Sequence, residues 1–217
     1  MTRTVRFVAR VAVLVALVAG TPVQTQTPEI DALRERAEQG DAEAQYDLGN
    51  RYFENADAAE AVRWYRLAAE QGHTDAQSFL GLVLASAGLG IPRDGTESMY
   101  WLRLAAENGD ARAQFNLGRN YERADDVPRD LAEGLRLYRL AAEQGYAEAL
   151  FALGDMYRSG RGVEQDDVQA YLWYELAASR EHAFGARSRD RTANRLTPEQ
   201  VAEAQRLARE WDEAHPR

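Results

Sequence analysis

The side chains that could do catalytic chemistry do not form a recognisable catalytic set in this sequence. The three histidines are His73, His182 and His215. None has an acid or a second histidine at the spacing that metal ligands take on a helix, and two fall at turns, which favours solvent-exposed turn residues. The pairs Gly88-x-Gly90 and Gly160-x-Gly162 follow no predicted strand and precede no lysine, so they do not predict phosphate-binding loops.

Carboxylates are numerous, but they recur at the same place in successive segments. An Asp stands three residues before Glu or Gln at Asp57, Asp94, Asp130 and Asp166. This spacing predicts a capping box at a helix start, where each side chain accepts a backbone N–H, rather than acid–base catalysis. We therefore expect no enzyme, no catalytic residue, no metal and no cofactor. The alternative is a cell-envelope hydrolase acting on wall-derived material, for which the sequence offers no nucleophile–base pair.

A row of aromatic residues is the strongest candidate for binding. Two residues before a recurring Leu-Gly pair stand Tyr46, Ser78, Phe115 and Phe151, and two residues after it stand Asn50, Leu82, Arg119 and Asp155. On a helix these positions point away from the packing face, and aromatic anchors tend to carry interface energy. We predict a partner-binding site made of Tyr46, Asn50, Phe115, Arg119, Phe151 and Asp155. The alternative is that the rings pack between successive helices.

The elements that must position this row are helices of a repeat. Four segments share an Ala, a Leu-Gly pair four residues later, then a second stretch with an aromatic residue and Ala-Ala. The Leu-Gly pairs are Leu48-Gly49, Leu80-Gly81, Leu117-Gly118 and Leu153-Gly154. The spacing places each Ala and Leu on one helical face, and the glycine leaves room for a neighbouring helix. Each segment therefore predicts two packed helices.

Glycine and proline mark the ends of these helices. Gly72, Gly109 and Gly145 follow the second helices, where a left-handed C-cap is expected. Thr197 followed by Pro198 predicts the capped start of one further helix. The loop inside the first repeat is four residues shorter than in the third, because Leu48 to Ala68 spans 20 positions and Leu117 to Ala141 spans 24.

The pattern Ala–x3–Leu-Gly–x2–Tyr, followed by Gly-x-Gly-Val, an Asp cap, Trp-Tyr and Ala-Ala, resembles the Sel1-like repeats, which are related to tetratricopeptide repeats. It is matched most closely at residues 149–178. The resemblance implies an all-α fold, an α-solenoid in which antiparallel helix pairs form a right-handed superhelix, with an adaptor function. Arg180-Glu181 departs from the pattern, since Gln-Gly is expected there, which suggests that the regular array ends at this point.

These observations predict eight segments. They are a signal peptide at 1–20, a polar lead-in at 21–27, a half-repeat helix at 28–40, repeats at 41–72, 73–109, 110–145 and 146–181, and a degenerate capping unit at 182–217.

Composition narrows the possible partners. The formal net charge is −9, and all 26 basic residues are arginine, so the chain is a poor match for nucleic acid or anionic lipid. Cysteine is absent, so no disulfide is possible and stability must come from packing. We expect a monomer whose partner is a protein or peptide bound along the concave face.

The N-terminus is typical of an export signal. Arg3, Arg6 and Arg10 precede an apolar run from Val11 to Ala19, and small residues follow at 18–20. The run is shorter than the ~20 residues of a membrane-spanning helix, which favours a cleaved signal over a retained anchor. We therefore expect a periplasmic or secreted protein without stable membrane insertion after cleavage.

Overall fold

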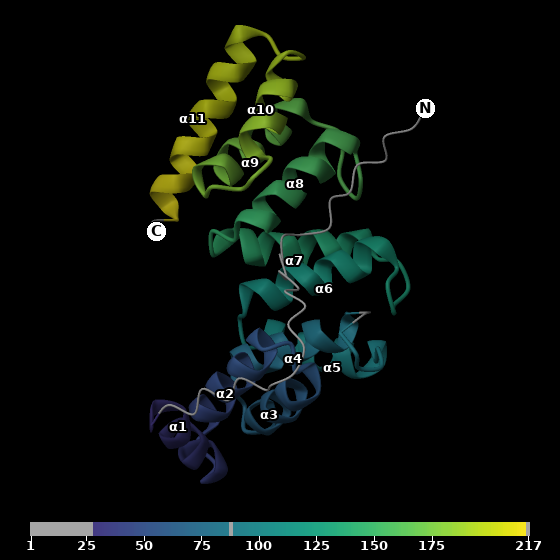
Figure 1. Cartoon of the computed structure of the whole chain (residues 1–217). Coiled ribbons are helices and arrows are strands. Elements are labelled where there is room, and N and C mark those ends of the chain that lie inside the picture. Colours follow the sequence, from purple (N-terminus) through teal and green to yellow (C-terminus); the bar gives the residue numbers. More distant parts are fainter. Residues whose placement is uncertain (1–27, 87–88, 216–217) are drawn as a thin grey trace, which may run out of the picture.

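A computed structural model describes residues 28–86 and 89–215, so the expected signal peptide and lead-in lie outside the described residues. The described residues form eleven α-helices and contain no strand. Consecutive helices pack against each other, and the stack runs in chain order from α1 at one end to α11 at the other (Figure 1). The expected all-α solenoid is therefore confirmed.

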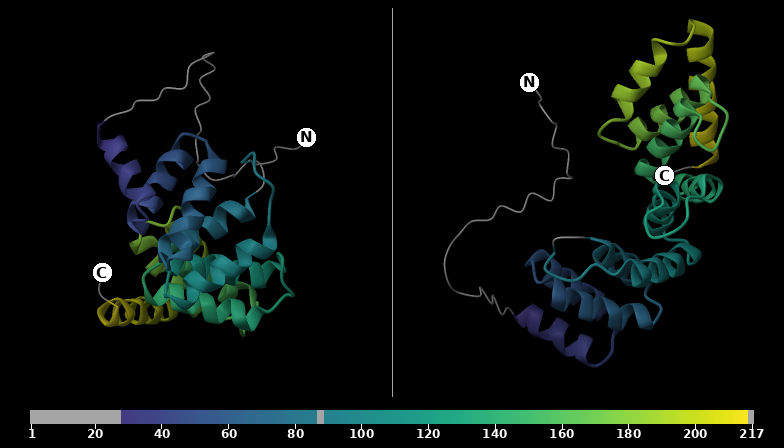
Figure 2. Two further views of the ribbon diagram at one scale, coloured as in Figure 1. Left: turned by 90° about the horizontal axis from the view of Figure 1, so that it is seen from below. Right: turned by 90° about the vertical axis from the view of Figure 1, so that its right-hand side faces the viewer.

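Eight of these helices form four pairs. The first helices of the pairs are α2 (Ala42–Glu54), α4 (Thr74–Ala85), α6 (Ala111–Arg123) and α8 (Ala147–Ser159). The second helices are α3 (Ala58–Glu70), α5 (Gly95–Glu107), α7 (Leu131–Glu143) and α9 (Asp167–Ser179). The first three second helices also pack against the first helix of the next pair, which makes the stack continuous and curved, as the side view in Figure 2 shows.

Helices outside the four pairs close both ends. At the N-terminal end α1 (Pro28–Glu38) packs on α2 as a lone second helix, and Gly40 follows it with a φ of +95°. At the C-terminal end α10 (Gly185–Ala193) and α11 (Pro198–Ala214) both pack on α9. Thr197 caps α11 in a complete capping box with Gln200. No helix in the described part of the chain is both long and apolar enough to cross a membrane.

Aspartates cap the second helices, but not in the form that the spacing predicted. The side chains of Asp57, Asp94, Asp130 and Asp166 each accept the backbone N–H three residues later. The return bond of a capping box does not form at Glu60 and Glu133, whose carboxylates instead pair with arginines three residues further on. These ion pairs lie within one exposed helical turn, where the guanidinium competes for the carboxylate.

The second helices end as predicted. Gly72, Gly109 and Gly145 have φ values of +89°, +91° and +74°. After α9 the same left-handed position is taken by Glu181, with a φ of +61°. Any residue other than glycine is strained there by ~1–2 kcal/mol. The fourth pair thus ends with the same backbone turn although the sequence departs from the pattern.

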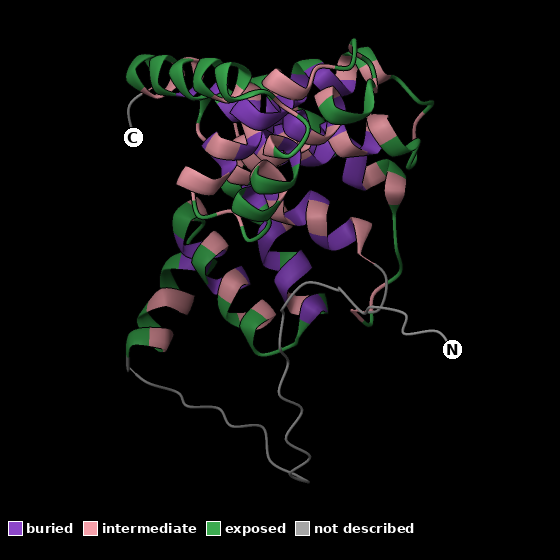
Figure 3. Cartoon of the chain, turned by 90° about the horizontal axis from the view of Figure 1, so that it is seen from above, coloured by how far each residue is buried: buried purple, intermediate pink, exposed green. Residues whose placement is uncertain are grey.

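Small residues let the paired helices approach closely. A Cβ atom at Gly49 or Gly154 would lie 2.6 Å from the ring of Tyr65 or Tyr174, and at Gly118 it would lie 3.0 Å from the ring of Tyr138. The three tyrosines are almost fully buried, at 0–1% exposure. In the first, third and fourth repeats the glycine beside the buried leucine therefore makes room for a tyrosine ring, and in the second repeat Gly81 makes room for Leu102. Figure 3 shows buried residues where helices face each other and exposed residues on the outer turns.

A ladder of buried amides fixes how the repeats stack. The side chains of Gln45, Gln77 and Gln114 donate to the carbonyls of Ala37, Ala69 and Ala106 at 3.0–3.2 Å. Each also accepts an amide from the end of its own repeat's second helix, from Gln71, Asn108 and Gln144 respectively. Because a buried amide is costly unless it is hydrogen-bonded, the ladder specifies one register between repeats. In the fourth repeat Leu150 takes this position.

Candidate functional site

The predicted aromatic row lies at the joints between repeats. The ring of Phe115 lies 5.6 Å from Tyr138 on α7 and 5.5 Å from Tyr146, the residue before α8. The ring of Phe151 lies 5.3 Å from Tyr174 on α9 and stacks at 4.2 Å on His182. Each phenylalanine therefore contacts the second helix of its own repeat and the first residue of the next.

The first repeat has the same joint, and the second repeat replaces it. Tyr46 lies 6.0 Å from Tyr65 and stacks at 4.7 Å on His73. In the second repeat Ser78 is buried and donates a 2.8 Å hydrogen bond to Asp110, which stands where the other joints have an aromatic ring. A polar pair has thus replaced a pair of rings.

Tyr46, Phe115 and Phe151 are half-buried. Each ring packs within a joint on one side, which is what the inter-repeat alternative predicts. The remaining surface of Phe115 and Phe151 lines a cavity, which is what a binding site requires.

This cavity, here called the α6–α8 pocket, has a volume of about 360 Å³. It gathers side chains from the first helices of the third and fourth repeats, from Tyr138 on α7 and from the turns after α8 and α9. Its lining residues are Phe115, Arg119, Glu122, Arg123, Tyr138, Glu148, Phe151, Ala152, Asp155, Arg161 and His182. Four of the six predicted binding residues, Phe115, Arg119, Phe151 and Asp155, therefore meet in one pocket.

Two carboxylates of the pocket are already held by neighbouring groups. Glu122 accepts the hydroxyl of Tyr138 at 2.7 Å and pairs with Arg161 at 2.5 Å. Asp155 accepts the hydroxyl of Tyr174 at 2.6 Å and pairs more loosely with Arg158. Burial raises the pKa of both tyrosines above the ordinary value, so their hydroxyls stay protonated and donate to the carboxylates.

Arg119 and Arg123 are the two arginines of the pocket without an ion pair in the described part of the chain, and Arg119 is the half-buried one. Its guanidinium lies 5.8 Å above the ring of Phe115 and forms no ion pair with any carboxylate among residues 28–86 and 89–215. Burial lowers the pKa of Arg119 below its ordinary value, and the neighbouring Arg123 lowers it further. An arginine nevertheless stays charged in proteins, so a half-buried cation lies over the ring of Phe115.

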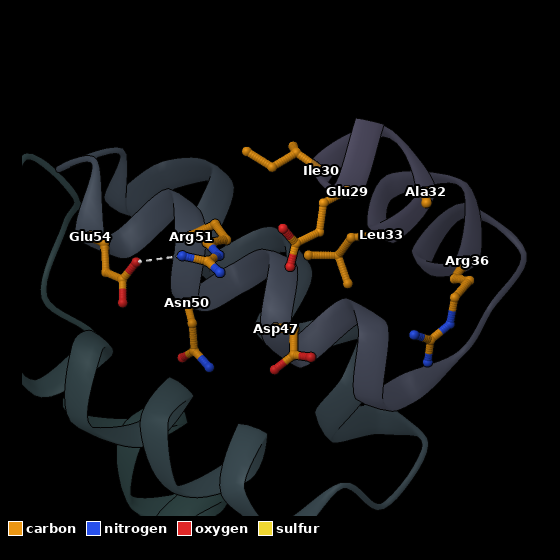
Figure 4. Close-up of a pocket in the computed structure, with 9 residues that line it drawn as sticks. All are labelled: Glu29, Ile30, Ala32, Leu33, Arg36, Asp47, Asn50, Arg51 and Glu54. Atoms are coloured by element: carbon orange, nitrogen blue, oxygen red, sulfur yellow. Dashed lines mark ion pairs between the residues drawn. The ribbon is translucent and has the colours of Figure 1, made fainter. Parts of the chain in front are cut away.

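The remaining predicted residues lie elsewhere. Tyr46 belongs to the core around α3 and α4, and Asn50 lines a different cavity, between α1 and α2 (Figure 4). Asn50 accepts the hydroxyl of Tyr65 at 2.8 Å, as Asp155 does for Tyr174. One pattern position thus performs the same structural task in two repeats while facing two separate cavities.

The α1–α2 cavity is the larger of the two, at about 700 Å³. Six of its nine lining residues are exposed, and Figure 4 shows Arg51 already paired with Glu54 inside it. We assign the candidate site to the smaller pocket because its rings and its guanidinium are partly withdrawn from water, which strengthens both apolar and charged contacts.

The prediction that the three histidines are solvent-exposed is wrong, because each is only partly exposed, and His215 stacks on Trp211 at 4.1 Å. The side chain of His73 is 13% exposed, caps α4 by accepting the N–H of Ala76, and contacts Glu43 at 2.9 Å. His182 is half-buried against Phe151, and its Nδ1 accepts the N–H of Phe184. The turn positions of His73 and His182 were right, but sequence could not show that an aromatic ring lies over each. No cluster of three or more metal-ligating side chains occurs in the described part of the chain.

Comparison with known proteins gives one family. The family model described as Sel1 repeat matches residues 42–73, 74–110, 111–146 and 147–182, well over half of the chain. A comparison with curated proteins gave no match.

Solved structures similar to this chain include a Sel1 repeat protein. A Sel1 repeat protein from Oxalobacter formigenes is 30% identical, with a TM-score of 0.71, over 82% of this chain and 75% of the other. The protective antigen c5321 of uropathogenic Escherichia coli is 28% identical, with a TM-score of 0.57, over 86% of this chain and 48% of the antigen. The present chain thus spans about half the length of that antigen. The immunity protein Pa5087 of Pseudomonas aeruginosa shares the fold at 22% identity and a TM-score of 0.54, over 84% of this chain and 73% of that protein.

Proposed function

Because the chain belongs to the Sel1 repeat family, whose members generally mediate contacts between proteins, we propose that it is an exported adaptor that holds a protein or peptide partner in the α6–α8 pocket. The pocket lies on the first helices, the face that we expect to be concave. Members of the family are typically scaffolds rather than enzymes.

One observation supports this site above the rest of the surface. Two repeats converge to place the half-buried rings of Phe115 and Phe151 next to charged groups in a single cavity. Aromatic anchors at the centre of a pocket, surrounded by polar groups, are the usual composition of a binding hot spot. The charged groups do not resemble a catalytic set, because Glu122 and Asp155 are engaged by tyrosine hydroxyls and arginines.

The proposed export is supported by the sequence of residues 1–20 alone. Arg3, Arg6 and Arg10 precede an apolar stretch of signal-peptide length. N-terminal sequencing of protein from the envelope fraction is expected to begin near Thr21. A chain recovered from the cytoplasm with its N-terminus intact would contradict export.

Site-specific crosslinking tests the adaptor function. A photoreactive benzoylphenylalanine is placed at Arg123, which lies exposed on the rim of the pocket, and in a second variant at Glu143, which lies exposed on α7 outside it. We expect a discrete protein or peptide adduct, identified by mass spectrometry, from position 123 only. Adducts of equal yield at both positions, or none at either, would overturn the proposal.

A further inference from the structure

Within the described ranges 28–86 and 89–215, two arginines that line the α6–α8 pocket, Arg119 and Arg123, pair with no carboxylate, whereas Arg161 pairs with Glu122. Arg123 is exposed on the rim, so Arg119 is the half-buried one of the two and lies over the ring of Phe115. A partly desolvated charge is unfavourable until an opposite charge reaches it. The position of Arg119 inside a cavity, rather than on a convex surface, makes it accessible to a ligand of the cavity's size.

The geometry of arginine favours one kind of anion. A guanidinium presents parallel N–H donors that match a carboxylate in a bidentate pair. The pocket also contains three acids: Glu122, Asp155 and the exposed Glu148 on α8. Arg119, Arg123 and Arg161 balance these three acids, so the lining carries no net formal charge. A singly charged carboxylate adds less unbalanced negative charge to it than a phosphate of charge about −1.5 to −2. The balanced lining therefore favours the smaller negative charge.

The two phenylalanines supply the apolar half of the subsite. Phe115 lies directly beneath the guanidinium of Arg119, and Phe151 lines the same cavity one repeat further on. Both rings are fixed from behind, Phe115 by Tyr138 and Phe151 by Tyr174 and His182. A rigid ring loses little conformational entropy on binding, so it is an efficient contact for an apolar side chain.

We propose that the α6–α8 pocket recognises an acidic peptide segment, in which one carboxylate pairs with Arg119 and a neighbouring apolar side chain contacts Phe115 and Phe151. The inference rests on the proposed adaptor function, since it specifies the chemistry of the partner. The carboxylate belongs either to an acidic side chain or to the C-terminus of the partner chain, and both sources present the same two oxygens to the guanidinium.

Matched synthetic peptides test the proposal. The probe is an acetylated hexapeptide with one Glu beside one Phe in a Gly/Ser background, made with a free and with an amidated C-terminus. The matched peptide carries Gln in place of Glu in both forms, and a fifth peptide carries phosphoserine in place of Glu. Binding is followed in the 15N-labelled protein through backbone amides and the Nε–Hε signals of arginine. We expect a carboxylate peptide to bind roughly tenfold more tightly than the amidated Gln peptide, as a charge-assisted hydrogen-bonded pair implies.

Three variants locate the effect. Arg119→Gln is expected to abolish the preference for carboxylate, and Arg119→Lys to retain only part of it, because lysine keeps the charge but loses the planar fork. Arg209→Gln is the matched control, since Arg209 is exposed on α11, lies outside the pocket and forms no ion pair in the described part of the chain. It is expected to keep the preference. Circular dichroism confirms that each variant is folded as the parent is.

Each outcome has a definite meaning. Preference for the free C-terminus alone, for the acidic side chain alone, or for both supports the proposal and names the source of the carboxylate. Equal binding of acid and amide peptides, no binding at millimolar concentration, tighter binding of the phosphopeptide, or an equal effect of Arg119→Gln and Arg209→Gln overturns it. A position-123 adduct combined with any of these results would overturn the acidic partner while the adaptor function stands.

Discussion

A single methyl group added at Gly154 tests the close contact between α8 and the Tyr174 ring, which supports the pocket. In Gly154→Ala the new Cβ would lie 2.6 Å from two ring carbons of Tyr174, whereas carbon atoms in contact normally stand about 3.5–4.0 Å apart. Tyr174 is fully buried, and its hydroxyl donates to Asp155 in the pocket at 2.6 Å. The ring therefore has no free space to move into, so α8 and α9 must separate.

Two opposing effects set the size of the change. Overpacking of a buried contact costs about 1–3 kcal/mol. Replacing glycine by alanine inside a helix stabilises it by about 1 kcal/mol. The expected net loss is therefore about 1 kcal/mol, equivalent to a Tm lower by roughly 2–4 °C for a chain of this length.

Urea unfolding followed by circular dichroism measures this loss. Gly118→Ala is the matched variant, because its Cβ would lie 3.0 Å from Tyr138 instead of 2.6 Å. We expect Gly118→Ala to lose less stability than Gly154→Ala. If Gly154→Ala gains about 1 kcal/mol, helix propensity alone would account for it, and the assignment of Gly154 as the seat of the Tyr174 ring would be refuted.

Two further predictions concern the rings and the histidine of the pocket. Phe115→Ala combined with Phe151→Ala is expected to abolish the crosslinked adduct. The double variant should also lose ~2 kcal/mol of unfolding free energy per ring, about half the ~3–5 kcal/mol of a fully buried phenylalanine, because both rings are half-buried. Urea unfolding measures this loss, and a full loss at each ring would place the rings in the core. Burial lowers the pKa of His182 below its ordinary value, so the unfolded chain takes up the proton first and stability is expected to fall as pH drops below about 6.5. Between pH 7.5 and pH 5, the free energy of unfolding should decrease less in His182→Gln than in the parent. An equal decrease in both proteins would contradict this prediction.

Sequence predicted the elements of this fold well because each carries a local signal. Repeated Leu-Gly pairs, aspartate caps and terminal glycines depend on a few neighbouring residues, and the helices begin and end close to them. The amide ladder has an equally regular signal, a glutamine three residues before leucine at Gln45, Gln77 and Gln114. It was missed because only the structure shows that each amide reaches a carbonyl of the preceding repeat.

The sequence predicted only part of the candidate site. Helical periodicity shows on which face of a helix a residue lies, but it does not show which cavity that face lines. Asn50 and Asp155 occupy the same pattern position and both accept a tyrosine hydroxyl, yet they line different cavities. Which cavity forms depends on the angle between successive repeats, and that angle depends on contacts between residues about 30 positions apart. The histidine stacking over Phe151 is a contact of this kind.

The interruption of the aromatic row at Ser78 explains why the pocket forms between the third and fourth repeats. A joint of two rings is bulky and holds successive first helices apart, whereas the buried hydroxyl of Ser78 meets the carboxylate of Asp110 within 2.8 Å. That carboxylate also caps α6 through the N–H of Ala113. The second joint therefore ties α4 directly to the start of α6 and leaves no ring to line a cavity. Two ring-bearing joints in succession occur only at Phe115 and Phe151 within residues 28–86 and 89–215, which is where the cavity containing Arg119 lies.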